Sequence, residues 1–419
     1  MRILLISQYY YPESFRINDV GEELVKKGHH VEALVGIPNY PTGIYFDGYG
    51  VFKKRVEIIN GVIVHRVFQI PRGKKSSKIL LSLNYLSYAL NACLWVLFYY
   101  SLKKKYDATF VFQVSPVTQA IPAVLLKKLR GTPLFLWVQD VWPDSVLTTL
   151  NENNEKRNNF ITNILTKLTE HVYRNSYKIL YSSSGMKTLI NRNNDYSGKE
   201  IYLPNWCDDM LKMPLEGNLH FPGDFKIMMA GNLGQGLGVD VVVGLIKSLS
   251  DIESLHFIIV GGGSLENYLK SRFKELGLNN VTMTGRLPFS QMPYLYEQAD
   301  AMLLTLKPTE VLSLKSTVPS RLQSYMSAGK PILGMIDGCA KEVIEAADCG
   351  YCVNAGDVNA MSQYIKNYLM SHQSEFKEKG KNSRKYFERY YLKSGCIANL
   401  EYYLRDDYTK PLPFNIPSV

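Results

Sequence analysis

A strand–loop–helix–strand pattern that occurs twice along the chain constrains the fold more than any other feature. Residues 2–7 form a short apolar run typical of a buried β-strand. A helix with apolar residues at helical spacing follows, Gly28 ends it, and a second strand is expected over 31–36. Short strands that alternate with helices predict a parallel sheet covered by helices on both faces.

The pattern restarts near residue 225. A glycine-rich turn follows each of the first two strands in this half. The expected strands here cover residues 225–230, 255–260, 281–284, 301–306 and 331–335. We therefore predict an α/β protein with two Rossmann-like, doubly wound domains. Ligands of such sheets bind at the carboxyl ends of the strands, so the two domains are expected to face a central cleft.

The domain boundary is expected in a stretch rich in turn residues between 205 and 224. We assign residues 1–210 to the first domain and 211–383 to the second. Residues 384–419 are expected to form C-terminal helices that pack back on the first domain, with a loose tail from 409 onward.

Composition limits the class of protein. Hydrophobic residues make up 46% and charged residues 21% of the 419 residues, which excludes a disordered or fibrous chain. The net charge of +10 favours anionic partners. No nucleic-acid-binding module is apparent, so phosphorylated ligands or an acidic membrane surface are expected instead. Cys349 and Cys352 are spaced as C-x-x-C, but no second ligand pair accompanies them and the seven histidines show no metal spacing, so no metal site is predicted.

One segment, residues 79–102, is a long apolar helix candidate without charge. Basic clusters flank it at 72–78 and 103–105, and a third lies at 127–130. Its length would allow a bilayer span, but Asn84 and Asn91 lie in its middle. A buried helix and an interfacial helix on an anionic lipid surface both remain open.

Three loops after expected strands contain candidate binding residues. Glycines in the loop 231–238 let backbone amides approach an anion closely. In the segment 315–321, Pro319 suits the first turn of a helix, so free amides and a nearby arginine could bind a diphosphate. The candidates in these loops are Ser14 and Arg16 in the first, Gly231 and Asn232 in the second, and Ser316, Ser320 and Arg321 in the third.

Several short motifs, in a fixed order over nearly the whole chain, carry a family resemblance. They include Pro38–Gly43, Trp137–Asp144, Ala230–Gly234, Gly285–Pro288 and Thr317–Pro331. With them the chain resembles the GT-B, family-4 retaining glycosyltransferases. Within that family it is most similar to the branch that builds bacterial surface polysaccharides, including the L-fucosamine and colanic-acid-type transferases.

The resemblance implies roles for individual residues. The nucleotide-sugar donor would be held by the second domain and the acceptor by the first. Arg286 and Leu287 match the segment that pairs with the nucleobase. Asn232 and Gly231 match one wall of the diphosphate site, and Ser320 and Arg321 match the other. Asp140 falls in the acceptor-side motif and is the catalytic candidate.

The chain departs from the family pattern at several positions. Two glutamates of many relatives are replaced by Ser316 and Ser324, and a histidine is replaced by Gln139. Paired glycines expected near the first loop are replaced by the segment 13–16. Our hypothesis is that Arg16, Arg286 and Arg321 restore positive charge lost elsewhere.

From these features we expect a retaining glycosyltransferase that needs neither a cofactor nor a metal. It would move a sugar, such as N-acetyl-L-fucosamine, from a UDP-sugar to an undecaprenyl-diphosphate-linked saccharide in capsule or O-antigen synthesis. The expected location is cytoplasmic, peripheral on the inner face of the bacterial plasma membrane. A sugar-nucleotide epimerase of the same fold and an inactive nucleotide-sugar-binding scaffold are the alternatives.

Overall fold

The computed structural model describes residues 1–73, 77–147, 155–406 and 411–414. The chain divides into two compact units. The N-terminal unit holds residues 1–182, 186–203 and 397–413, and the C-terminal unit holds residues 183–185, 204–396 and 414–419. The main connections between the two units therefore follow Leu203 and Cys396, whereas the sequence analysis placed the boundaries after residues 210 and 383.

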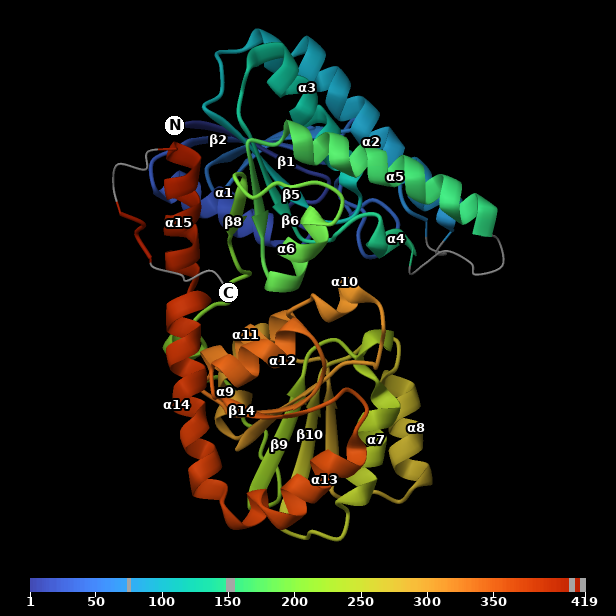
Figure 1. The fold of residues 1–419 in the computed structure, drawn as a ribbon, viewed down its shortest axis with the longest axis vertical. Helices are drawn as coiled ribbons and strands as arrows, with labels where there is room; N and C mark the ends of the chain where they lie inside the picture. Colours follow the sequence, from blue (N-terminus) through green and yellow to red (C-terminus); the bar gives the residue numbers. More distant parts are fainter. Residues whose placement is uncertain (74–76, 148–154, 407–410, 415–419) are drawn as a thin grey trace. The chain divides into compact units, whose positions relative to one another are not determined.

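The N-terminal unit is built on an eight-stranded sheet with the order β3-β4-β2-β1-β5-β6-β7-β8 (Figure 1). All neighbours are parallel except β3, which runs antiparallel to β4. The strands are β1 (Arg2–Ser7), β2 (His30–Gly36), β3 (Val56–Ile59), β4 (Val62–Val67), β5 (Ala108–Gln113), β6 (Leu134–Val138), β7 (Lys178–Tyr181) and β8 (Glu200–Tyr202).

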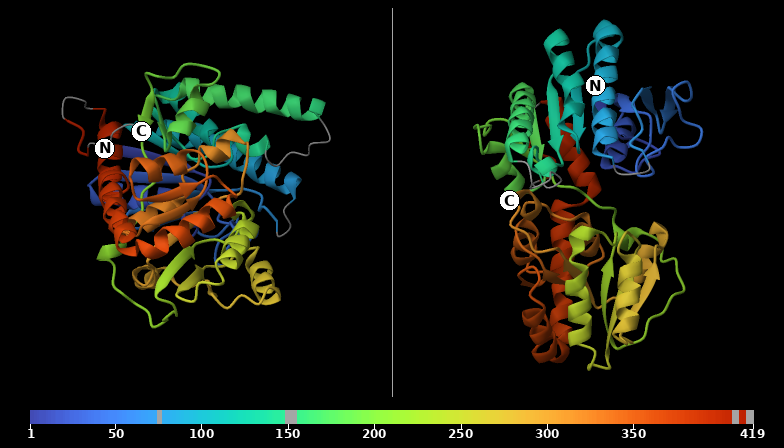
Figure 2. Two further views of the ribbon diagram at one scale, coloured as in Figure 1. Left: turned by 60° about the horizontal axis from the view of Figure 1, so that its bottom comes forward. Right: turned by 90° about the vertical axis from the view of Figure 1, so that its right-hand side faces the viewer.

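Helices cover both faces of this sheet. They are α1 (Arg16–Lys26), α2 (Lys78–Phe98), α3 (Ile121–Arg130), α4 (Asp144–Leu147), α5 (Glu155–Asn175) and α6 (Ser184–Asn191), with 3₁₀ turns η1 (Tyr100–Leu102) and η2 (Val117–Ala120). In the right-hand view of Figure 2, α2 and α3 run side by side, and α3 also contacts α5. Helix α1 connects β1 to β2, and this connection runs along the sheet in the opposite direction from those that contain α2 and α3. Because such connections are right-handed, α1 lies on the other face of the sheet from α2 and α3.

The C-terminal unit contains a six-stranded, fully parallel sheet with the order β11-β10-β9-β12-β13-β14. Its strands are β9 (Phe225–Ala230), β10 (Leu255–Val260), β11 (Val281–Gly285), β12 (Ala301–Thr305), β13 (Ile332–Met335) and β14 (Gly350–Val353). Its helices are α7 (Val239–Ser248), α8 (Glu266–Glu275), α9 (Met292–Glu297), α10 (Leu312–Lys315), α11 (Ser320–Ser327), α12 (Cys339–Ala346), α13 (Val358–Asn367) and α14 (Gln373–Tyr390). The 3₁₀ turns are η3 (Met210–Lys212), η4 (Gln235–Leu237), η5 (Phe289–Gln291) and η6 (Leu369–Ser371).

Strand residues alternate between two apolar cores in the C-terminal unit. Ile227 and Met229 of β9 pack on the side covered by α7, α8 and α13, whereas Met228 and Ala230 pack on the side of α9, α11 and α12. The alternation follows from the two-residue period of a strand, which is why a fully buried strand reads as a continuous apolar run. The fold is thus the expected α/β class with two Rossmann-like parallel-sheet units.

Two C-terminal helices differ from the expected ones. The helix expected from residue 384 is the end of the longer α14, which belongs to the C-terminal unit. The last helix, α15 (Lys393–Arg405), carries the chain back to the N-terminal unit. There Glu401 accepts a hydrogen bond from His29 at 2.8 Å and pairs with Lys27 at 3.0 Å. Most of the expected tail, residues 409–419, lies outside the described residues.

Candidate functional site

Three loops meet at the carboxyl ends of β9, β10 and β11 in the C-terminal unit, and the first two are rich in glycine. The amide of Leu233 donates to Gly262 O at 3.0 Å, and the amide of Gly261 donates to Gly285 O at 2.9 Å. On the other side, Lys307 N donates to Gly236 O at 2.9 Å. The loop 231–238 is therefore held by main-chain bonds from both neighbouring loops.

Glycine is required where these loops touch. A Cβ on Gly261 would lie 2.0 Å from Gly231 O, and one on Gly263 would lie 2.5 Å from Leu233 O. Gly261 also has a φ of +134°, which side-chain-bearing residues rarely adopt. The loops can approach this closely only because Gly261 and Gly263 have no side chain at these contacts.

We expect Gly261→Ala to destabilise the C-terminal unit by more than about 2 kcal/mol, because both the clash and the positive φ oppose the new methyl group. The matched control lies in the neighbouring loop. Gly236 has a φ outside the left-handed region, and a Cβ added to it would meet nothing within 4 Å, so Gly236→Ala should leave stability within about 1 kcal/mol of the parent. Chemical denaturation of both variants checks this. Equal stabilities would contradict the close packing of the loops.

Arg321 points at this loop from the second residue of α11. Its Nη2 donates to Asn232 O at 3.2 Å. Its Nη1 is buried and, among the described residues, has no hydrogen-bond partner. A guanidinium with an unused donor beside a glycine loop is suited to bind an anion such as a phosphate.

A buried tyrosine fixes α11 in this position. The hydroxyl of Tyr325 donates to Ala230 O at 2.9 Å and accepts from Ala230 N at 2.9 Å, so it joins α11 to the last residue of β9. Tyr325 lies one turn after Arg321, on the inner side of the helix. This anchor holds Arg321 next to Gly231 and Asn232, and the exposed Ser320 precedes it at the first position of α11.

The two serines at the glutamate positions do not face this loop. Ser316 is 3% exposed, and its hydroxyl donates to Ser313 O at 2.9 Å. Ser324 lies 3.3 Å from Cys207 Sγ, on a side of α11 that packs against the core. Arg286 is exposed directly after β11, whereas Leu287 packs partly into the core. Of these four side chains, Arg286 is the most exposed, Leu287 and Ser324 are half-buried, and Ser316 is buried.

In the N-terminal unit, loops at the carboxyl edge of the sheet are linked by hydrogen bonds. Glu13, after β1, accepts the amides of Asn39 at 2.8 Å and Tyr40 at 2.7 Å, after β2. Tyr9 donates to Ser115 O at 3.3 Å, after β5. These bonds join the loops after three strands into one surface.

Asp140, the catalytic candidate, adds the loop after β6 to this set. Its Oδ2 accepts from Ser115 N at 2.8 Å and from Ser115 Oγ at 2.7 Å. Trp142 donates to the same hydroxyl at 3.1 Å. Gln139 precedes Asp140, and its backbone N–H donates to Gln113 O at 2.9 Å. Asp140 therefore lies among the strand-end loops, half-buried and oriented by Ser115.

Two other candidates in the first loop lie apart from these contacts. Ser14 is exposed. Arg16 begins α1 and pairs with Asp19 of the same helix at 3.5 Å.

Sequence reasoning missed Glu13 and treated Arg72 only as part of a basic cluster. Glu13 is 2% exposed, and burial raises its pKa to about 7. The guanidinium of Arg72 lies over the rings of Tyr9, Tyr40 and Tyr85, at 5.2, 5.1 and 5.5 Å. The departure from paired glycines at 13–16 was the one signal that this loop is built differently.

Glu13 should make stability depend on pH. Its folded pKa lies above the unfolded value, so the folded state holds the proton more tightly and loses stability as pH rises from about 4.5 to 7. Glu13→Gln keeps two of the amide bonds and cannot ionise. We expect the melting temperature of the variant, relative to the parent, to rise between pH 5 and pH 8. A constant difference in thermal melts across that range would contradict the assignment.

Comparisons with known proteins bear on the fold of the chain. Three solved structures with a similar fold are a sucrose-phosphate synthase from Thermosynechococcus elongatus, HepE from Anabaena in complex with UDP, and WaaG, a glycosyltransferase involved in lipopolysaccharide biosynthesis. Their sequence identities are 14%, 15% and 12%, and their TM-scores 0.73, 0.68 and 0.60. The alignments cover 97%, 97% and 95% of this chain and 98%, 100% and 98% of the others. At such identities the likeness shows the fold, which is GT-B.

The activity class comes from a family model. Residues 216–386 match the family described as Glycosyl transferases group 1. This segment contains the glycine loops and Arg321. The match, together with the fold, shows that the chain is a glycosyltransferase. Among curated proteins, none matches the chain.

Proposed function

We propose that this glycosyltransferase takes its sugar from a UDP-sugar and passes it to a lipid-linked saccharide. The observation that carries the proposal is the buried Nη1 of Arg321, without a hydrogen-bond partner among the described residues, beside the loop at Gly231 and Asn232. Arg321 and main-chain amides of that loop would hold the diphosphate, and the loop after β11, with Arg286, would hold the base. HepE, of similar fold, is known in complex with UDP and with UDP-glucose, which supports a uridine nucleotide.

The chemistry asks the protein to hold charge and to orient two partners. In a retaining front-face transfer, the acceptor oxygen bonds to the anomeric carbon on the side from which the diphosphate departs. The bond from that carbon to the phosphate oxygen breaks, and the departing phosphate takes the acceptor's proton. Arg321 would stabilise the growing negative charge. Asp140 would orient the acceptor hydroxyl.

Several finer points belong to the same proposal. The acceptor would be an undecaprenyl-diphosphate-linked saccharide, the sugar a deoxy-amino sugar such as N-acetyl-L-fucosamine, and the product a capsule or O-antigen, as in the fucosamine and colanic-acid-type branch. WaaG, whose fold is similar, acts in lipopolysaccharide biosynthesis, which supports a surface-polysaccharide role. The protein would work peripherally on the inner face of the plasma membrane, without a metal or cofactor.

The test uses purified protein, a panel of radiolabelled UDP-sugars and undecaprenyl-diphosphate saccharides, with and without EDTA. The expected result is label in the lipid fraction, an unchanged anomeric configuration by NMR, and no effect of EDTA. Asp140→Asn should lower kcat without weakening UDP binding. An isomerised donor would identify an epimerase, and UDP-sugar binding without turnover on any acceptor would identify a scaffold.

A further inference from the structure

Helix α2 is apolar on its exposed side and more polar on its buried side. Its exposed positions, apart from Lys78 and Ser82, are all large apolar residues. Most of them recur every three or four residues along one stripe, the leucine stripe: Ile79, Leu83, Leu86, Leu90, Leu94 and Leu97. Asn84 and Tyr88 lie on the opposite, buried side. This is the reverse of the pattern that favours a helix in contact with water. Such a face needs an apolar cover.

The inner side of α2 is fastened to the N-terminal unit. Asn84 accepts from Gln8 Nε2 at 2.7 Å and donates to Ile70 O at 2.6 Å, and Tyr88 donates to Leu34 O at 3.1 Å. By length and composition, the segment Lys78–Leu102 could cross a membrane. Crossing would break these buried bonds and uncover the sheet, so α2 can meet a bilayer only with its outer side.

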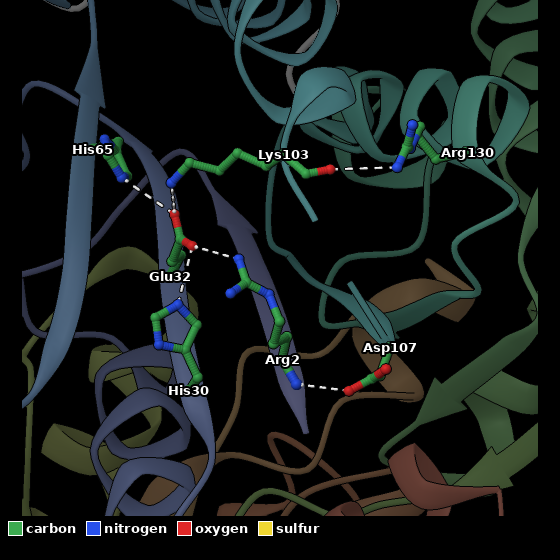
Figure 3. Close-up of polar contacts among 7 residues, drawn as sticks. All are labelled: Arg2, His30, Glu32, His65, Lys103, Asp107 and Arg130. Atoms are coloured by element: carbon green, nitrogen blue, oxygen red, sulfur yellow. Dashed lines mark hydrogen bonds and ion pairs between the residues drawn. The ribbon is translucent and has the colours of Figure 1, made fainter. Parts of the chain in front are cut away.

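The far end of the helix is tied down by charge. Lys103, directly after η1, pairs with the buried Glu32 at 2.9 Å, and its carbonyl accepts from Arg130 at 3.3 Å (Figure 3). Arg2 and His65 also converge on Glu32. The stripe therefore runs along a helix fixed at both its middle and its end.

The surroundings of the stripe are basic. Lys78 precedes it, and Lys104, Lys105 and Lys128 are exposed beyond its carboxyl end. Between residues 58 and 139 the sequence contains a single carboxylate, Asp107. Two copies of this face packed together would bring lysines against lysines. An anionic lipid surface instead satisfies both the apolar stripe and the charges.

A hollow on the same helix adds a place for part of a lipid. It has a volume of about 300 Å³ and is lined by Leu94, Trp95, Phe98 and Tyr99. An apolar hollow open to one side suits an acyl or prenyl chain better than water.

We propose that the outer face of α2 lies flat in the headgroup region of an anionic bilayer, with the leucine stripe inserted and the helix neither spanning nor buried. This inference rests on the proposed function in one respect: a lipid-linked acceptor gives the enzyme a reason to bind there. Vesicle binding is measured without any sugar, so its failure and the failure of the transfer reaction are distinguishable.

The experiment is flotation of the full-length protein with vesicles of phosphatidylcholine alone or mixed with phosphatidylglycerol. We expect binding to the mixed vesicles that weakens with added salt. Leu86→Glu with Leu90→Glu should reduce that binding by at least about tenfold, since charge would have to enter the interface. The control pair is Leu211→Glu with Leu215→Glu on the C-terminal unit, because these leucines are equally exposed (61% and 59%, against 59% and 63%).

Depth can be read from Trp95. It is half-buried in the hollow, whereas Trp137, Trp142 and Trp206 are buried. Lipids brominated near the headgroup should quench its fluorescence more than lipids brominated near the chain end. The proposal would be overturned if lipids brominated near the chain end quenched Trp95 more strongly. It would also be overturned if the Leu86→Glu, Leu90→Glu variant bound vesicles as well as the parent, or if the parent bound no vesicles. A stable dimer in solution that the same variant converts to monomer would overturn it as well.

Discussion

Arg321→Ala is expected to weaken UDP binding at least about tenfold, equivalent to ~1.4 kcal/mol or more, because a hydrogen bond to a charged group contributes about 1.5–3 kcal/mol. The donor KM should rise, or kcat fall, by a similar factor. Isothermal titration with UDP measures the binding effect directly and needs no acceptor.

Two further variants make this test specific. Arg321→Lys keeps the charge but loses the planar pair of donors, so it should recover only part of the affinity. Arg272→Ala removes a partly exposed arginine that pairs with Glu275 on α8, and it should bind UDP like the parent. If Arg321→Ala and Arg272→Ala bind UDP equally well, the assigned diphosphate site is wrong.

Glu32→Gln is expected to destabilise the N-terminal unit by about 3 kcal/mol, because it removes a buried charge and leaves the cations of Arg2 and Lys103 without their anionic partner. Glu32 is 1% exposed, and Arg2, His30, His65 and Lys103 all lie within ion-pair distance of it (Figure 3). Most of these partners are only partly buried, which keeps the loss below the top of the range for buried pairs. Urea denaturation should show it.

The loss should also depend on pH. Despite the opposing effect of burial, hydrogen bonds from His65 and Lys103 hold the pKa of Glu32 well below its usual range. A lowered folded pKa gives stability that is present above the unfolded pKa and is lost as pH falls toward the folded value. The gap between parent and Glu32→Gln should therefore be full at pH 7 and shrink below about pH 4.

A surface pair provides the control. Glu23→Gln removes a half-buried partner of the exposed Lys26, at 3.0 Å within α1, and it should change stability by less than about 0.5 kcal/mol. A Glu32→Gln protein as stable as Glu23→Gln would show that the cluster at the end of α2 is not an anchor.

The sequence predicts most of the C-terminal sheet closely because its central strands are largely apolar. The expected strand over 225–230 coincides with β9, and the one over 255–260 coincides with β10. Helix α14 begins well before the expected residue 384. Gly380 lies within this helix, and a glycine usually weakens a helix. Here a Cβ on Gly380 would lie 2.2 Å from Gly329 O, so the absence of a side chain allows the close contact between the two segments.

The site was predictable in part for a similar reason. The glycines follow strands and Arg321 opens a helix, and that order places them at one edge of the sheet. The direction in which a helical side chain points depends on how its helix packs, which the sequence does not show. Ser316 and Ser324 occupy the motif positions of ligands, yet both hydroxyls contact other protein atoms. Glu13 and Glu32 were missed because a single sequence gives no sign that a carboxylate is buried and paired.

The loop 231–238 rests on contacts of main chain with main chain, so its shape should tolerate changes in the exposed side chains around it. Asn232, Arg286 and Lys307 are exposed in or near this loop, and their side chains do not support it. A library of substitutions at these three positions should broaden the range of accepted sugar nucleotides, whereas Arg321 and the main-chain amides of the loop should still bind the diphosphate. The fold thereby separates what can be re-engineered from what must stay glycine.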